Sequence, residues 1–187
     1  MVKTIILAGM AGSGKSTVAR MIAKKYGFEF FCGGDALKQF AKEQGYSVSG
    51  DDWWETAQGI KFLNHRLTDK SFDKKIDSIL IKRAKKGGVV ITSWALPWLF
   101  KGGFKIWLSA GYEARAKRIV GRDKIKYEQA LEAVKKRDET NISLYKQLYN
   151  YDLSSDLAPF DLVINTDLFL ADKVFQIADK AISLLKW

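Results

Sequence analysis

The chain has 187 residues, 47% of them hydrophobic and 28% charged, which is typical of one globular domain and too short for two ordinary ones. One cysteine and one histidine exclude an intramolecular disulfide and a histidine-based metal site, and no apolar run approaches the ~20 residues of a membrane span. The formal net charge of +10 favours an anionic partner; we expect nucleotides, with nucleic acid as the less favoured alternative because the basic residues are scattered over helices.

Five short hydrophobic runs predict the strands of a parallel sheet covered on both faces. They are TIILA (4–8), FEFFC (28–32), VVITS (89–93), FKIWL (104–108) and DLVIN (161–165). The first run leads directly into a glycine-rich turn, so we interpret it as a strand and not as a signal peptide, and we expect a cytoplasmic protein. Apolar residues at helical spacing predict helices over 14–26, 35–44, 73–86, 112–121, 126–149 and 171–185. The alternation predicts a single three-layer α/β/α domain over 1–187.

A phosphate-binding motif follows the first predicted strand. The pattern G-x-x-x-x-G-K-[ST] is satisfied by Gly9, Gly14, Lys15 and Ser16, at the start of a predicted helix. Its glycines let successive N–H groups turn inward around phosphates, and the helix N-terminus adds partial positive charge. We expect ATP with Mg²⁺, with Lys15 on the terminal phosphates and the Ser16 hydroxyl on the metal. The predicted ATP-binding residues are Gly9, Ala11, Gly12, Ser13, Gly14, Lys15, Ser16 and Thr17.

Residues 45–70 have weak periodicity and contain the pair Trp53 and Trp54. We interpret this segment as an insertion that forms a mobile flap, and we favour packing beneath the flap as the role of the two tryptophans. The sequence has no N-K-x-D-like base reader of a GTPase, and the run 89–93 ends without the carboxylate that an ATPase motor usually has there. A small kinase remains the favoured class of P-loop protein.

Arginines predict a lid on the other side of the phosphate loop. Arg115, Arg118 and Arg122 are spaced i, i+3 and i+7, which predicts that they share one helix face. The short charged joint 121–127 follows them directly. Three arginines before such a joint favour a closing lid over a solvated charged face, because a kinase needs cations around the transferring phosphoryl group.

Several segments resemble one family over nearly the whole chain. They are GMAGSGKSTVARMIAKKYGFEF, GGDALKQFAKEQGYS, KIWLSAGYEARAKRIVGRD, ALEAVKKRDETNISLYKQLYNYDL and FDLVINTDL. These segments resemble the nucleoside monophosphate kinases, most closely the short cytidylate kinases of the archaeal type. The resemblance implies a P-loop NTPase fold with strand order 2-3-1-4-5, an acceptor-binding insertion at about 34–70 and a lid at about 118–127. It also implies an enzyme that phosphorylates CMP or dCMP with ATP, as a monomer or a dimer.

The resemblance assigns roles to individual residues. Asp35 corresponds to an acidic residue that approaches the metal-bound water, and Lys38 to an arginine that grips the acceptor phosphate. Alternatively, Asp35 stabilises a helix N-terminus and Lys38 is a solvated charge. Arg118 and Arg122 match lid arginines, and Arg137 matches the first arginine of a later pair. The implied catalytic residues are Lys15, Arg118, Arg122 and Arg137. Asn165 and Thr166 lie in the segment that passes near the donor base in such kinases.

Departures from the family pattern gather on the acceptor side. Trp94 occupies the position of the EGR arginine that holds the monophosphate, and Leu144 the position of the second arginine of the pair. The residues that read cytosine correspond to 78–80, Ser-Ile-Leu, although Asp73 and Asp77 remain. An arginine-to-tryptophan change replaces a phosphate ligand with a stacking surface. The expected acceptor-binding residues are Asp35, Lys38, Asp73, Asp77 and Trp94.

Three hypotheses therefore stay open for the acceptor. The protein phosphorylates CMP through substitute cations, for which Lys38, Lys61 and Arg66 are candidates. It phosphorylates a different, less charged acceptor that stacks on Trp53, Trp54 or Trp94. Or it hydrolyses ATP slowly in the service of RNA or a ribosomal particle, which predicts a salt-sensitive affinity for RNA.

Overall fold

A five-stranded parallel sheet organises the chain, in the order β2-β3-β1-β4-β5 that the family resemblance implies. The computed structural model describes residues 3–50, 53–54, 56–123, 125–153 and 155–186. The strands are β1 (Thr4–Ala8), β2 (Glu29–Cys32), β3 (Val89–Thr92), β4 (Phe104–Ser109) and β5 (Leu162–Asn165). Because all neighbours are parallel, with Leu7 opposite both Thr92 and Ile106, the carboxyl ends of the strands lie at one edge of the sheet.

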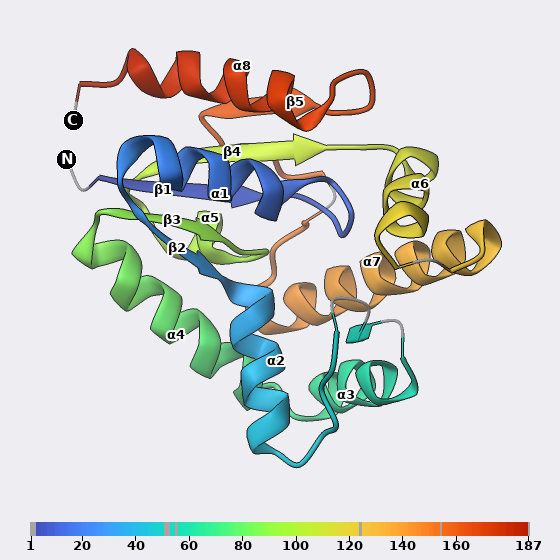
Figure 1. Ribbon diagram of the computed structural model, residues 1–187. Helices are drawn as coiled ribbons and strands as arrows, with labels where there is room; N and C mark the ends of the chain where they lie inside the picture. The colour runs from blue at the N-terminus through green and yellow to red at the C-terminus, as the bar shows by residue number, and fades with distance from the viewer. Residues whose placement is uncertain (1–2, 51–52, 55, 124, 154, 187) are drawn as a thin grey trace.

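Helices cover both faces of the sheet, as expected (Figure 1). They are α1 (Lys15–Tyr26), α2 (Gly33–Glu43), α3 (Ala57–Thr68), α4 (Ser71–Lys86), α5 (Leu96–Leu99), α6 (Tyr112–Asp123), α7 (Tyr127–Tyr149) and α8 (Ala171–Ser183). Within the described residues, none of them is long and apolar enough to cross a membrane.

Two hydrophobic cores lie on opposite faces of the sheet. On one face, Ile5 and Leu7 of β1 pack with apolar residues of α1 and α8. On the other, Ile6 packs with apolar residues of α2, α3, α4 and α5. The alternation along β1 follows from the two-residue repeat of a strand and explains why its sequence is apolar throughout.

The two outer strands differ from the expectation that every strand is buried on both faces. Every residue of β1 and β3 is buried, whereas β2 is only partly buried and Val163 of β5 is 45% exposed. Both outer strands pair with one neighbour only. A continuous apolar run predicts a strand but does not distinguish the centre of a sheet from its edge.

The predicted insertion contains a helix that its weak periodicity did not predict. In α3, Phe62 enters the core on the α4 face of the sheet. Trp53 is 1% exposed and its ring packs against Trp54 at 4.9 Å, consistent with the expected packing role. The first turn of α3 lies directly on this pair, because a Cβ at Gly59 would lie 2.0 Å from the Trp53 carbonyl oxygen.

Candidate active site

The phosphate loop is a tight turn between β1 and α1. Gly9 has φ 145°, and a Cβ there would lie 2.3 Å from the Leu108 carbonyl oxygen, so the loop is held against β4. Gly14 caps α1 with φ 91° and no side-chain hydrogen bond, and it faces open space. The first N–H groups of α1 therefore have no side-chain cap, which makes this helix end ready to bind an anion.

The Lys15 ammonium group folds back onto its own loop. Its Nζ donates to the Met10 carbonyl oxygen at 2.7 Å and lies 5.7 Å from the centre of the Trp94 ring. Burial, and then the positive charge of Arg137, lower the pKa of Lys15 to about 7. At neutral pH this group is therefore only partly protonated until an anion binds beside it.

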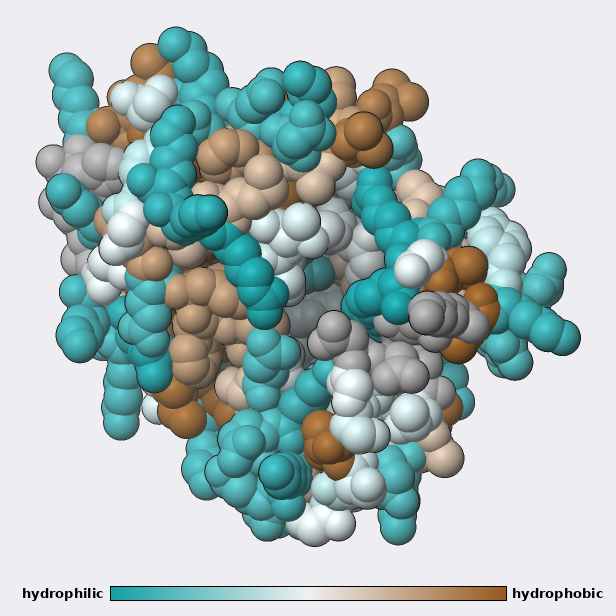
Figure 2. Space-filling model, viewed as in Figure 1, coloured by the Kyte–Doolittle hydropathy of each residue, from teal (hydrophilic) through white to brown (hydrophobic). Residues whose placement is uncertain are grey.

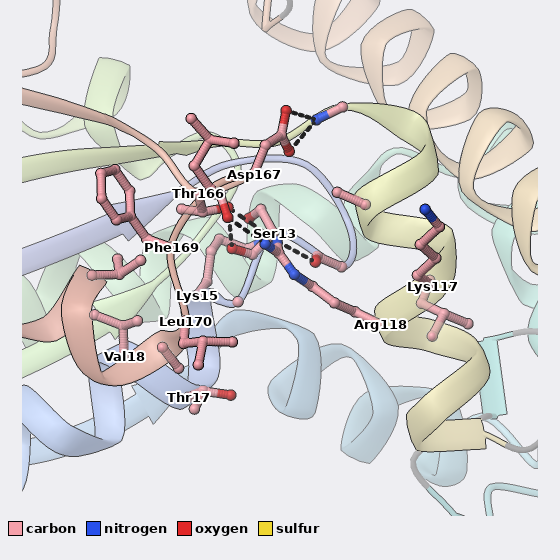
Figure 3. Close-up of a pocket in the computed structure, with 18 of the residues that line it drawn as sticks. Ser13, Lys15, Thr17, Val18, Lys117, Arg118, Thr166, Asp167, Phe169 and Leu170 are labelled. Atoms are coloured by element: carbon pink, nitrogen blue, oxygen red, sulfur yellow. Dashed lines mark hydrogen bonds between the residues drawn. The ribbon is translucent and has the colours of Figure 1, made fainter.

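A large open pocket adjoins the phosphate loop. Its volume is about 1210 Å³, and it is lined by the loop, by α6 and by residues 166–171. Figure 2 shows the face of the molecule hollowed near its centre, between the sheet and α6. Arg118 donates to the Thr166 hydroxyl at 3.0 Å and to the Thr166 carbonyl oxygen, reaching across the pocket from α6 (Figure 3). Exposed Arg122 lines the same pocket.

The pocket has an apolar side opposite Arg118. Figure 3 shows Val18, Phe169 and Leu170 gathered there, and Leu170 is 78% exposed. Asp167 accepts hydrogen bonds from the Gly111 N–H at 2.9 and 3.2 Å, which ties this segment to the start of α6. The pocket therefore offers an apolar wall next to the phosphate loop, as the base and the phosphates of a nucleotide require.

Arg115 differs from the other two arginines of α6. Its side chain is 3% exposed and forms two hydrogen bonds with Asp138 of α7, at 3.0 and 2.7 Å. It also donates to the Ala11 carbonyl oxygen at 3.2 Å. Arg115 therefore supports the phosphate loop from behind and is not on the lid face that the sequence spacing predicts. Of these three arginines, Arg118 and Arg122 line the large pocket and Arg115 does not.

The residues expected to hold Mg²⁺ lie at the starts of two helices. Ser16 is half-buried in the first turn of α1, and Asp35 is exposed in the first turn of α2. Within the described part of the chain, no group of three or more His, Cys, Asp or Glu side chains could hold a metal by itself. One hydroxyl and one carboxylate nevertheless fit Mg²⁺, which retains several waters and takes other oxygens from substrate phosphates.

A second, smaller cavity lies between α2, α3, α4 and α7. Its volume is about 60 Å³, far below the 300–1,000 Å³ of typical ligand pockets. Trp54, Asp77, Trp94, Arg137 and Asn141 are among its lining residues. The Arg137 guanidinium carbon lies 5.6 Å from the centre of the Trp54 ring. This cavity occupies the region where the family resemblance implies the acceptor.

A buried polar network supports the floor of the cavity. Arg66 makes two hydrogen bonds to Asp73, at 3.0 and 2.6 Å, and the Tyr145 hydroxyl donates to Asp73 at 3.2 Å. Asp77 is 3% exposed and accepts a hydrogen bond from Tyr149 at 2.9 Å. The pKa of Asp77 is raised to about 7, chiefly by burial and also by the nearby Asp73 charge, while the hydrogen bond from Tyr149 opposes the shift.

Some expected acceptor residues do not line the cavity. Asp73 is committed to Arg66, and Lys38 donates to the Gly50 carbonyl oxygen at 3.0 Å. Exposed Lys61 is not among the lining residues, and Arg66 lines the cavity with its charge already paired. Of the three candidate substitute cations, Arg66 alone borders the cavity.

The positions at which the sequence departs from the family pattern contribute little polar surface to the cavity, and neighbouring residues line it instead. Leu144 is fully buried, whereas Asn141 and Tyr145 line the cavity. Both lie on the same face of α7 as Arg137, at i+4 and i+8, so this spacing was the signal that could have identified them. Leu80 lines the cavity as an apolar group, while Ser78 and Ile79 are exposed.

Comparison with known proteins identifies similar chains over the full length. The profile of the cytidylate kinase-like family matches residues 4–168. The cytidylate kinase of Methanocaldococcus jannaschii is 35% identical over 187 residues, covering 97% of this chain and 98% of the relative. The cytidylate kinase of Ignicoccus hospitalis is 34% identical over 174 residues, covering 92% of this chain and 94% of the relative.

Solved structures show the same fold at lower identity. Shikimate kinase from Acinetobacter baumannii in complex with shikimate has a TM-score of 0.60 and 18% identity, covering 100% of this chain and 97% of that chain. An uncharacterized protein from Eubacterium ventriosum has a TM-score of 0.62 and 18% identity, covering 98% and 99%. At this identity the likeness supports the P-loop kinase fold alone.

Proposed function

Because the chain belongs to the cytidylate kinase-like family, we propose that it is an ATP-dependent cytidylate kinase, which forms the diphosphate of CMP or dCMP and releases ADP. The observation that carries the proposal is the position of Lys15 and Trp94. Lys15 lines the large pocket, Trp94 lines the small cavity, and the two side chains touch. The large pocket and the small cavity therefore meet at Lys15, the phosphate-loop cation on which phosphoryl transfer from ATP depends.

The donor binds in the large pocket. The N–H groups of the phosphate loop bind the phosphates of ATP, Lys15 leaves the Met10 carbonyl for the terminal phosphates, and the base lies against the apolar wall. Ser16, with Asp35 through water, would hold Mg²⁺, which supplies charge neutralisation on the phosphates. Arg118 and Arg122 enclose the donor from α6. The dependence on Mg²⁺ and these residue roles are part of the proposal.

The acceptor binds in the small cavity after the cavity widens. A space of about 60 Å³ is too small for a nucleotide, so α3 and the Trp53–Trp54 segment must move away from α7. Arg137 and Lys15 then lie on either side of the transferring group, and their positive charges lower the barrier. The acceptor phosphate is already an anion at neutral pH, so no strong general base is required.

The comparisons favour a nucleotide acceptor over the other two hypotheses. The curated relatives are named cytidylate kinases, whereas the likeness to shikimate kinase concerns the fold alone. The loss of an arginine at Trp94 leaves fewer cations for the acceptor phosphate. We therefore expect weaker binding of CMP than an additional arginine would give, but the same reaction.

The test is phosphoryl transfer to individual acceptors. The protein is incubated with Mg-ATP and separately with CMP, dCMP, UMP, AMP or GMP, and ADP and diphosphate products are quantified against a control without acceptor. Stimulation by CMP or dCMP with formation of the matching diphosphate supports the proposal. Lys15→Met serves as the control for contaminating kinases, because it removes the phosphate-loop cation. ADP release that no monophosphate accelerates would overturn the proposal.

A further inference from the structure

An indole ring covers each of the two cations that flank the junction between the pockets. Trp94 lies against Lys15, with 5.7 Å from Nζ to the ring centre, and Trp54 lies against Arg137 at 5.6 Å. Both distances are within the ~6 Å of a cation–π contact. Both rings also line the small cavity, so its wall combines two aromatic faces with the guanidinium groups of Arg66 and Arg137.

Trp94 is part of the partition between the two pockets. Lys15 lines the large pocket and not the small cavity, whereas Trp94 lines the small cavity and not the large pocket. The contact between them therefore crosses the wall that separates the two spaces. Trp94 packs against the buried cluster of Ala95, Tyr145 and Leu153, against which Met10 of the phosphate loop also packs.

We propose that Trp94 is a positioning residue that selects the phosphate acceptor over water, because its ring closes the wall between the donor pocket and the cavity until an acceptor enters. The proposal rests on the proposed function, since it concerns the same donor site. An indole ring carries one N–H donor and no acceptor that could take a proton from water, and its apolar face excludes solvent from the phosphate-loop side of the cavity.

The selection concerns two reactions of the same phosphoryl group. In transfer, the bond from the γ-phosphorus to the bridging oxygen of ATP breaks, an oxygen of the acceptor phosphate bonds to that phosphorus, and ADP leaves. In hydrolysis, a water oxygen forms the new bond instead, and inorganic phosphate, ADP and a proton are released. An arginine at this position would bind phosphate but would also leave a hydrated passage, whereas the ring blocks the passage to water.

The experiment compares substitutions at position 94 with a matched control. Trp98 is half-buried in the same hydrophobic cluster but lines neither pocket, so Trp98→Ala removes an indole without opening the wall. Phosphate release from Mg-ATP is measured without acceptor for wild type, Trp94→Ala, Trp94→Phe and Trp98→Ala. Affinity for a non-hydrolysable ATP analogue is measured by calorimetry in parallel.

Trp94→Ala is expected to raise acceptor-free hydrolysis above the wild-type rate, because removing the ring opens the wall to water. Trp94→Phe restores the ring and is expected to restore the wild-type rate, and Trp98→Ala to leave it unchanged. With CMP present, Trp94→Ala is expected to form less CDP per ADP released. Equal hydrolysis in Trp94→Ala and wild type, at equal affinity for the analogue, overturns the proposal.

One further variant and one further readout, CDP formation by wild type, complete the experiment. If Trp94→Ala does not fold, Trp94→Leu is the second variant: its side chain is apolar but much smaller than indole and leaves the wall open, so hydrolysis equal to wild type in that variant also overturns the proposal. If wild type forms no CDP while Trp94→Ala still hydrolyses ATP faster, the cytidylate kinase proposal fails, and of the role of Trp94 only the exclusion of water stands. If wild type forms CDP and hydrolysis is insensitive to position 94, the role of Trp94 alone fails.

Discussion

Asp77 lines the small cavity, and its protonation couples the pH to the free energy of unfolding of the whole protein. Its carboxyl group is 3% exposed, and burial raises its pKa from 3.8 to about 7. The charge of Asp73 contributes to this rise, while the hydrogen bond from Tyr149 and the charge of Arg66 oppose it. The folded protein therefore holds a proton on Asp77 at pH values where the unfolded chain has already released it.

The sign and size of the effect follow from proton linkage. Between pH 3.8 and about 7 the folded state binds more protons than the unfolded state, so raising the pH lowers the free energy of unfolding. Above about 7 both states are ionised at this site and the loss is complete. The change between pH 5 and pH 8 corresponds to about two pH units, or about 3 kcal/mol.

Asp77→Asn removes this loss because an amide does not ionise, and its oxygen can still accept from Tyr149. Urea denaturation of wild type and Asp77→Asn at pH 5 and pH 8 measures the effect. We expect the variant to gain about 3 kcal/mol relative to wild type between the two pH values. Glu139→Gln, an exposed change on α7, is the control and should gain nothing. An equal difference between variant and wild type at both pH values would show that Asp77 does not cause the pH dependence.

Three other predictions test the phosphate loop and its supports. ATP affinity of wild type should fall about tenfold for each pH unit above 7, because the Lys15 pKa near 7 leaves fewer protonated ammonium groups, whereas Lys15→Arg should show a flat profile by calorimetry. Trp94→Arg should tighten binding of CMP alone about tenfold, since it adds a charged hydrogen-bonding group beside the cavity. Asp138→Ala should lower the free energy of unfolding by about 3–5 kcal/mol in urea titrations, because Arg115 would stay buried without its carboxylate.

Each of these predictions has a contrary outcome. A wild-type pH profile as flat as that of Lys15→Arg would show that the Lys15 ammonium is fully protonated throughout. Weaker binding of CMP to Trp94→Arg would indicate that the ring itself contacts the acceptor. A loss below about 1 kcal/mol in Asp138→Ala would mean that Arg115 finds another partner or reaches solvent.

The conformation of the phosphate loop could be predicted from the sequence because its parts are local. Nine consecutive residues, 9–17, contain the turn, the lysine and the hydroxyl, and their conformation depends mainly on glycine and on a helix start. The strand order came from the family resemblance and is confirmed. The exposure of β2 and β5 was not predicted, because an apolar run does not show which strands are at the edges.

The acceptor half could not be predicted in the same way because it depends on pairs that are distant in sequence. The spacing of Arg115 predicts a lid arginine, but the fold places Asp138, 23 residues away, in hydrogen-bond contact with it. Arg66 is a candidate cation for the acceptor phosphate by sequence, but in the structure it forms a buried salt bridge with Asp73. Spacing along one helix predicts which residues share a face, but not which partner another helix brings to that face.

Gly59 does not line the small cavity, but it lies against Trp54, which does. A Cβ at this position would lie 2.0 Å from the Trp53 carbonyl oxygen and 2.8 Å from the Trp54 Cα atom. Even a methyl group would therefore push the tryptophan pair away from α3 and shift Trp54 relative to Arg137. A side chain at this glycine would therefore change the shape of the cavity, and a mutational library confined to cavity-lining residues would never sample it.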